Sequence, residues 1–123
     1  MNSNKEMESS LKLKISNWEL DFYSRPIIES NGKKRWDLII CSTKSCKTED
    51  VFLWNKKCPA NEVNSVWLTK ALNEAISEAK TQGWEKPPIV RFWRSSMKSI
   101  IKKSLEAVSI EAVSYTHLTL PTI

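Results

Sequence analysis

Apolar and polar residues alternate through the stretch that begins at Trp18 and ends before Pro26. Trp18, Leu20 and Phe22 fall on one face of an extended chain. The remaining residues carry polar groups and fall on the other face: Glu19, Asp21, Tyr23 and Arg25. This period of two predicts a β-strand with one buried face, against which later parts of the chain pack.

A second strand is predicted over residues 35–41, connected to the first by a turn at Asn31-Gly32. Asn-Gly favours the two positive φ angles of a type I′ turn. In a regular hairpin, the apolar side chains of the second strand would lie on the face of the sheet that faces away from Leu20 and Phe22. A shift of one residue in register moves every side chain to the other face. One extra residue removes this conflict, so we predict a β-bulge near residues 24–26.

The rest of the pattern predicts two more strands and two helices. The strands are expected at residues 51–54 and 89–93, and the helices at residues 61–82 and 95–108. Asn61 is the expected N-cap of the first helix, and Gly83 its stop. The order β-β-β-α-β-α predicts the α/β class, as an α+β layered fold with a mixed sheet covered by two helices.

Composition indicates one domain with one hydrophobic core, since the chain has 123 residues and 41% of them are hydrophobic. No apolar run reaches the roughly 18 residues of a membrane span, so none is expected. The net charge of +5 favours an anionic partner such as a nucleic acid. Six tryptophans are many for this length, and each either packs the core, stacks on a base or anchors a partner.

Cysteine and histidine usage argues against most enzymatic chemistry. The three cysteines, Cys41, Cys46 and Cys58, form no C-x-x-C pair, and His117 is the single histidine. This indicates a reducing compartment and no zinc site. There is no Gly-rich phosphate loop and no Ser-His or Cys-His pair in the central part. We therefore expect a protein that is not an enzyme, with no catalytic residue, bound metal or cofactor.

The two ends of the chain differ from its centre. Residues 1–16 are polar and are expected to be flexible or to add an edge strand at residues 11–15. They lack the apolar segment of a secretory signal, and Glu6 and Glu8 argue against a transit peptide. The predicted domain covers residues 17–112.

Residues 113–122 read Val-Ser-Tyr-Thr-His-Leu-Thr-Leu-Pro-Thr. The transposon-end sequencing adapter GTC TCT TAT ACA CAT CTG ACG CTG CCG ACG encodes this run in frame. We therefore expect residues 113–123 to be a non-native tail that does not pack, with the natural gene cut off near Ala112. His117 would then be foreign to the natural protein.

Basic and aromatic residues occur together in Arg91-Phe92-Trp93-Arg94 and again at a hairpin tip. Guanidinium groups bind phosphates through paired hydrogen bonds, and an adjacent aromatic ring can stack on a base. In the alternative interpretation, Phe92 or Trp93 fills the core and the charges are solvated. The candidate RNA-binding residues are Arg91, Trp93, Arg94, Lys98, Lys102, Lys33, Lys34 and Arg35.

Three carboxylates, Glu19, Asp21 and Asp37, lie on neighbouring predicted strands. Strand carboxylates can chelate Mg²⁺, and the element order loosely resembles restriction-endonuclease-like cores. However, the Asp/Glu-x-Lys triplet of those enzymes is missing from the strands. The favoured interpretation is that the acids pair across the sheet with Arg25, Arg35 or Arg91.

Four segments in this order resemble one family. They are Trp18-Glu-Leu-Asp-Phe-Tyr-Ser-Arg-Pro26, Asn31-Gly-Lys-Lys-Arg-Trp36 with Leu38-Ile-Ile-Cys41, Cys58-Pro-Ala60 with Val63-Asn-Ser65 and Trp67-Leu68, and Pro88-Ile-Val-Arg-Phe-Trp-Arg94 with Met97 and Ile100-Ile101. Together they resemble the N-terminal domain of the Tab/Atab RNA-binding proteins of cyanobacteria and chloroplasts. Two departures are Trp93, where a second Phe is usual, and the absence of the family's C-terminal half.

The resemblance implies an RNA-binding factor that activates translation of mRNAs for photosystem I subunits, and in some plant members also serves photosystem II. Its partners would be an mRNA 5′ leader and translation or photosystem assembly proteins. A cyanobacterial-type source implies a cytoplasmic location, and a plastid lineage the chloroplast stroma. Two alternatives remain open at this point: a Mg-dependent nuclease-like enzyme that uses Glu19, Asp21 and Asp37, and a protein-docking assembly module with exposed tryptophans.

Overall fold

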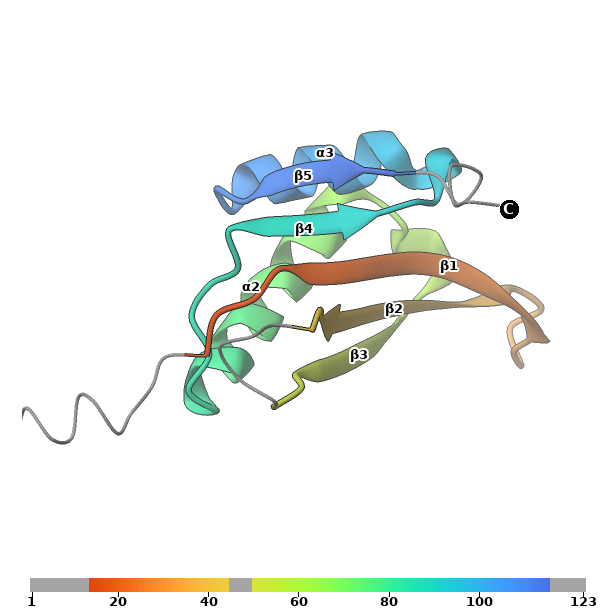
Figure 1. Cartoon of the computed structure of the whole chain (residues 1–123). Helices are drawn as coiled ribbons and strands as arrows, with labels where there is room; N and C mark the ends of the chain where they lie inside the picture. Colours follow the sequence, from red (N-terminus) through yellow and green to blue (C-terminus); the bar gives the residue numbers. More distant parts are fainter. Residues whose placement is uncertain (1–13, 45–49, 116–123) are drawn as a thin grey trace, which may run out of the picture.

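A computed structural model of the chain describes residues 14–44 and 50–115. The elements are β1 (Trp18–Ile28), β2 (Lys34–Ser42), β3 (Leu53–Cys58), η1 (Ala60–Glu62), α2 (Ser65–Thr81), β4 (Ile89–Phe92), η2 (Ser95–Met97), α3 (Lys98–Ala107) and β5 (Glu111–Ser114). One sheet has the strand order β3-β2-β1-β4-β5, and both helices lie on the same side of it (Figure 1). This confirms the α+β class and the mixed sheet covered by two helices.

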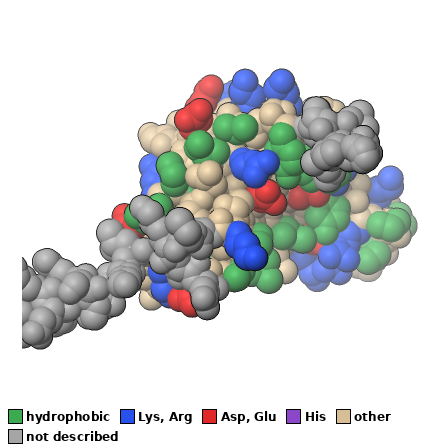
Figure 2. Space-filling view, viewed as in Figure 1, with side chains coloured by type: hydrophobic (Ala, Val, Ile, Leu, Met, Phe, Trp, Pro, Cys, Tyr) green, Lys and Arg blue, Asp and Glu red, His purple; other side chains and the backbone are tan. Residues whose placement is uncertain are grey.

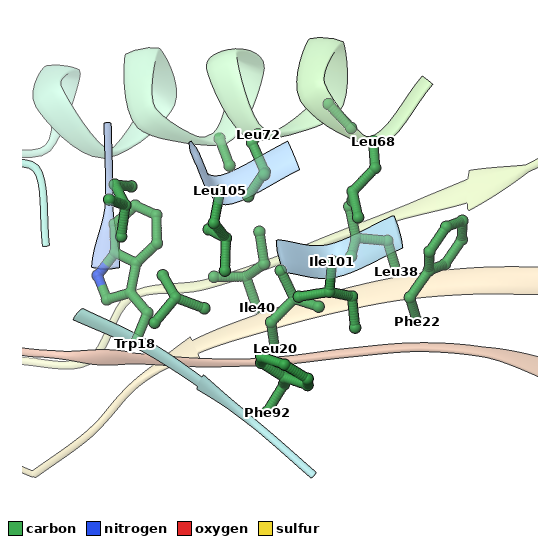
Figure 3. Close-up of a cluster of buried hydrophobic side chains, with 14 of the residues drawn as sticks. Trp18, Leu20, Phe22, Leu38, Ile40, Leu68, Leu72, Phe92, Ile101 and Leu105 are labelled. Carbon is green, nitrogen blue, oxygen red and sulfur yellow. The ribbon is translucent and has the colours of Figure 1, made fainter. Parts of the chain in front are cut away.

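Strand β1 organises the sheet because it pairs on both sides. It runs antiparallel to β2 and parallel to β4, while β2 pairs with β3 and β4 with β5. The alternation of β1 sends Trp18, Leu20 and Phe22 into the core, each almost fully buried. Figure 3 shows these side chains pointing toward Leu68 and Leu72 of α2 and Ile101 and Leu105 of α3, which supply the other half of the core.

The predicted bulge is present in β1. The register between β1 and β2 shifts between Arg25 and Ile28, and as a result Leu38 lies opposite Phe22, on the buried face. The turn, however, is not type I′. Gly32 has a φ of 81°, but Asn31 does not have a positive φ. The loop is closed by a hydrogen bond from the N–H of Gly32 to the carbonyl of Glu29, at 2.8 Å. Only Gly32 takes the left-handed conformation, whereas a type I′ turn needs two such residues.

The third strand lies later than predicted. Residues 51–54 are apolar, yet β3 begins only at Leu53 and extends through Lys56 and Lys57 to Cys58. Phe52 instead leaves the strand to fill the core, where its ring stacks on Trp18 at 5.0 Å. β3 is an edge strand that pairs with β2 on one side. Its polar residues join the strand through backbone hydrogen bonds to β2, which do not depend on the side chain.

The first long helix also begins later than predicted. Asn64 is its N-cap, and the Asn64 side chain accepts a hydrogen bond from the N–H of Trp67 at 2.8 Å. Asn61 lies in the separate turn η1. The expected stop is confirmed, since Gly83 follows the helix with a φ of 91°. The second helix is divided into η2 and the shorter α3.

A fifth strand was not predicted. β5 pairs in parallel with β4, and the N–H of Tyr115 donates to the carbonyl of Phe92 at 3.0 Å. The expectation that nothing after Ala112 packs is therefore wrong for residues 113–115. The predictions for residues 1–13, Cys46 and His117 lie outside the described residues.

Candidate nucleic-acid interface

The helices leave one face of the sheet uncovered, and we call it the open face. It carries the alternate residues of β1, namely Glu19, Asp21, Tyr23 and Arg25. Figure 2 shows acidic side chains near the middle of this face, with Lys and Arg side chains around them and hydrophobic side chains between. Charge and aromatic surface are therefore interleaved over the central strands, as in proteins that bind single-stranded nucleic acid.

Arg94 contacts a carboxylate and two aromatic rings on the open face. It follows β4, and its Nε and Nη2 donate to the two carboxylate oxygens of Asp21 on β1 at 2.8 and 3.0 Å. Its guanidinium also lies over the rings of Trp93, at 4.6 Å, and Tyr23, at 5.5 Å. The hydrogen bonds to Asp21 raise the pKa of Arg94. Asp21 and Arg94 thus hold two aromatic rings in fixed positions on the open face.

Arg91 makes a looser ion pair. Its Nη1 lies 3.5 Å from Oε2 of Glu19, which is directly opposite in the parallel register of β1 and β4. Both side chains are about two-fifths exposed, so water competes strongly for this pair. The Arg91 guanidinium also lies over the ring of Tyr115, at 4.5 Å, so Arg91 has a second contact besides its exposed ion pair with Glu19.

A second group of charges lies where β1, β2 and β3 meet. Arg25 donates to the Asp37 carboxylate, and Arg35 approaches the same carboxylate at 3.4 Å. The Asp37 side chain is 7% exposed, and its hydrogen bond raises the pKa of Arg25. These side chains surround a hollow of about 140 Å³, completed by Ile39, Asn55, Lys56 and Lys57. We call it the hairpin hollow.

The structure brings together only part of the predicted RNA-binding set. Arg91, Trp93 and Arg94 lie beside β1, and Arg35 lines the hairpin hollow. Lys33 and Lys34 are exposed at the hairpin. Lys98 and Lys102 are exposed on α3, in the helical layer rather than on the open face. Phe92 is fully buried, so the core interpretation is correct for that ring.

Sequence reasoning missed Arg25, Tyr23 and Lys57 as neighbours of this set. Arg25 and Tyr23 could have been predicted, because the alternation of β1 already placed them on the polar face. Lys57 could not be found, since β3 was predicted to end before it.

The carboxylates pair with arginines, as favoured by the sequence. Glu19 faces Arg91, and Asp37 faces Arg25 and Arg35. The pair between Asp21 and Arg94 was not foreseen. Within residues 14–44 and 50–115, no group of three or more His, Cys, Asp or Glu side chains is placed to hold a metal ion.

The two described cysteines are free thiols, of which Cys58 is buried and Cys41 partly buried. Burial raises the pKa of Cys41, and burial with the nearby Glu62 carboxylate raises the pKa of Cys58 to about 12. A thiol with such a pKa is neutral at physiological pH, so Cys58 acts as a small core side chain.

The fold is similar to that of two solved viral proteins. The simian T-cell lymphotropic virus intasome in complex with PP2A regulatory subunit B56 gamma matches with a TM-score of 0.56, over 85% of this chain and 33% of that one, at 10% identity. The HTLV-2 integrase catalytic core domain in complex with magnesium matches with a TM-score of 0.52, over 87% of this chain and 64% of that one, at 16% identity. At such identities the likeness concerns the fold alone, which is that of an integrase catalytic core.

The sequence then identifies the family. The chain belongs to the RNA-binding protein Tab2/Atab2 N-terminal family, whose model matches residues 17–120. It is 38% identical over 100 residues to the chloroplastic protein TAB2 homolog of Arabidopsis thaliana and 42% identical over 100 residues to that of Zea mays. Each alignment covers 80% of this chain but only 24% and 23% of the relatives, so the chain spans about a quarter of their length. Among the described helices, none has the length and apolar character required to cross a bilayer.

Proposed function

We propose that this chain binds single-stranded RNA on the open face of the sheet. The observation that carries the proposal is membership of the Tab2/Atab2 RNA-binding family over residues 17–120. The open face supports it with suitable chemistry. Tyr23 and Trp93 provide aromatic surface for bases, and Arg91 provides a cation in a weak, exposed ion pair.

Arg94 has a different role in this proposal. Its guanidinium is engaged by Asp21 and covered by rings, so it positions Trp93 and Tyr23 rather than neutralising a phosphate. The phosphate contacts then fall to the cations around it. These are Arg91, whose ion pair with Glu19 is exposed although its guanidinium also lies over the Tyr115 ring, and the exposed hairpin lysines Lys33 and Lys34. Lys98 and Lys102 lie outside this path unless the RNA continues around the edge of the sheet.

In the complete protein, this RNA binding would serve translation of photosystem subunit mRNAs, with the 5′ leader as the bound segment. The names of the Arabidopsis and maize relatives place those proteins in the chloroplast. For this chain we propose a plastid stroma or a cyanobacterial cytoplasm, together with translation or photosystem assembly proteins as partners. We propose that it is not an enzyme.

The test is a titration of the 123-residue chain into a fluorescently labelled, unstructured 20-nucleotide RNA, followed by anisotropy at several salt concentrations. The logarithm of affinity should fall linearly with the logarithm of salt, with a slope of about −0.7 for each phosphate contacted. The charge-conserving pair Asp21→Asn/Arg94→Gln and the variant Arg91→Gln should both weaken binding. Lys70→Gln, on the exposed side of α2, is the matched control. Salt-independent binding, or full affinity in the open-face variants, would refute the proposed interface.

The likeness to integrase cores gives the nuclease alternative one specific observation in its favour. The same preparation incubated with labelled RNA and DNA in Mg²⁺ would reveal cleavage. We expect none, because the carboxylates of Glu19, Asp21 and Asp37 are all engaged by arginines. Cleavage that disappears in Asp21→Ala would replace our proposal with the enzymatic one.

A further inference from the structure

Two arginines face each other directly across the first hairpin. Arg25 of β1 and Arg35 of β2 are cross-strand partners in the antiparallel register. Like charges at directly opposite positions destabilise a sheet. The next pair on the same face of the sheet is Tyr23 with Asp37, and Asp37 is at the same time the register partner of Lys57 on β3. Two arginines therefore share one carboxylate, and Lys57 occupies the neighbouring register position on β3.

The single carboxylate does not balance this group. Asp37 accepts from Arg25 and is approached by Arg35 at 3.4 Å, which leaves the hairpin hollow with an excess of positive charge. Among residues 14–44 and 50–115, no carboxylate forms an ion pair with Lys57. Lys56 points to the other side of the sheet, where it pairs with Glu74 of α2. The positive charges of Arg25, Arg35 and Lys57 therefore lie together on the open face.

The shape of the site fits a small anion. The hollow has a volume of about 140 Å³, and the residues that line it include four cations, Arg25, Arg35, Lys56 and Lys57, against the single carboxylate of Asp37. Arginine forks and a lysine ammonium are the donors that bind phosphate oxygens in proteins. A group that carries one negative charge would relieve the repulsion between Arg25 and Arg35, and would need no other change in the sheet.

We infer that the hairpin hollow is a phosphate subsite, in which Arg25, Arg35 and Lys57 bind one phosphodiester of the RNA strand. The inference rests on the proposed RNA-binding function and adds to it the position of a backbone contact. Tyr23 is the next residue of β1 on the open face, and its ring lies 5.8 Å from the guanidinium of Arg25, which lines the hollow, and 5.5 Å from that of Arg94. A strand whose phosphate occupies the hollow can therefore place an adjacent base on the ring of Tyr23.

The test uses the anisotropy titration with the variants Lys57→Gln and Arg35→Gln/Lys57→Gln. Each keeps Arg25 on the buried Asp37, so neither leaves that carboxylate without a cation. Lys57→Gln should weaken RNA binding roughly two- to fivefold. Because the three cations bind one and the same phosphodiester, neither variant should reduce the magnitude of the salt slope by more than about 0.7, and the double variant should come closer to that limit. Lys70→Gln removes the same charge from α2 and should leave the slope unchanged. Thermal melting should show that Lys57→Gln is as stable as the parent chain.

The outcomes separate the subsite from the wider function. Binding by the parent chain with an equal slope in Lys57→Gln and Lys70→Gln overturns the subsite and leaves RNA binding intact. No binding by any form overturns both. Inorganic phosphate, added at constant ionic strength, should compete with RNA for the parent chain and lose that effect in the double variant. Phosphate binding that RNA does not displace would assign the hollow to a small phosphate compound and overturn the RNA contact.

Discussion

The Arg94 guanidinium holds both carboxylate oxygens of Asp21, although 73 positions separate the two residues in the chain. The contact joins the end of β4 to the middle of β1 on the open face. Both side chains are about a quarter to a third exposed, so the pair is partly desolvated. It therefore links β4 to β1 at the point where the Arg94 guanidinium also contacts the rings of Tyr23 and Trp93.

A double-mutant cycle over Asp21→Asn and Arg94→Gln should give a coupling free energy of about 1 to 2 kcal/mol, because a bidentate, charge-assisted pair is lost in each single variant. Urea denaturation followed by tryptophan fluorescence measures the free energy of unfolding of each form. The matched cycle over Glu19→Gln and Arg91→Gln should give no more than about 0.5 kcal/mol, since that pair is longer and more exposed. Equal couplings in both cycles would contradict the special role of Arg94.

Asn64 should contribute measurably to the stability of α2. Its side chain satisfies the N–H of Trp67, and Asn64→Ala leaves that donor without its cap, at a cost of about 0.5 to 2 kcal/mol in the free energy of unfolding. Asn61→Ala makes the same chemical change one turn earlier, outside α2, and should have an effect below about 0.5 kcal/mol. Chemical denaturation of both variants decides which asparagine is the cap. A larger loss for Asn61→Ala would restore the earlier helix start.

Phe22 should be one of the most sensitive core positions. Its ring is fully buried and lies 5.5 Å from the ring of Trp67, in a stacked arrangement, and 5.7 Å from that of Trp36. Phe22→Ala creates a cavity and loses both contacts, so the free energy of unfolding should fall by about 3 to 5 kcal/mol. Ile28, on the same strand, is 62% exposed, and Ile28→Ala should change stability by less than about 0.5 kcal/mol. Similar thermal melting of the two variants would disprove this assignment of the core face.

Cys58 should make stability depend on alkaline pH. Its pKa is about 12 in the folded chain and 9.0 for the ordinary thiol, so the unfolded chain releases this proton first as pH rises. The stabilisation is complete below pH 9 and is lost progressively between pH 9 and 12. Because lysines and tyrosines titrate in the same range, the measured quantity is the difference between the parent chain and Cys58→Ala at pH 8 and pH 10.

That difference in free energy of unfolding should shrink at the higher pH. In the same preparation, mass spectrometry after brief exposure to iodoacetamide at pH 8 should find Cys58 unmodified in the folded chain and modified in urea. Rapid modification of Cys58 without urea would contradict its raised pKa.

Much of the fold is determined by local sequence pattern. The alternation from Trp18 to Phe22 identified the buried face of β1, because side chains in a strand point to opposite sides at every step. The need to keep Leu38 on that same face required a bulge, which the structure has between Arg25 and Ile28. The motifs also identified the family that the later comparison confirmed.

Where weak local signals compete, tertiary contacts determine where a strand or helix begins and ends. Phe52 belongs to an apolar run, but its place against Trp18 takes it out of β3, and the polar residues up to Lys57 join the strand through pairing with β2. The start of α2 depends on which asparagine side chain accepts a hydrogen bond from a free N–H of the first turn. Asn64 accepts from Trp67, whereas Asn61 lies in the preceding turn η1.

The alternation of residues already determined that β1 has one apolar and one charged face. The sequence also shows the four arginines and three carboxylates that meet on the open face, namely Arg25, Arg35, Arg91, Arg94, Glu19, Asp21 and Asp37. Their partners were decided by register between strands far apart in the chain. Asp21 meets Arg94 because β4 lies parallel beside β1, and Asp37 is shared by Arg25 and Arg35 because the bulge sets them opposite each other. Periodicity is a property of neighbouring residues, whereas the pairing of charges requires the whole sheet to be assembled.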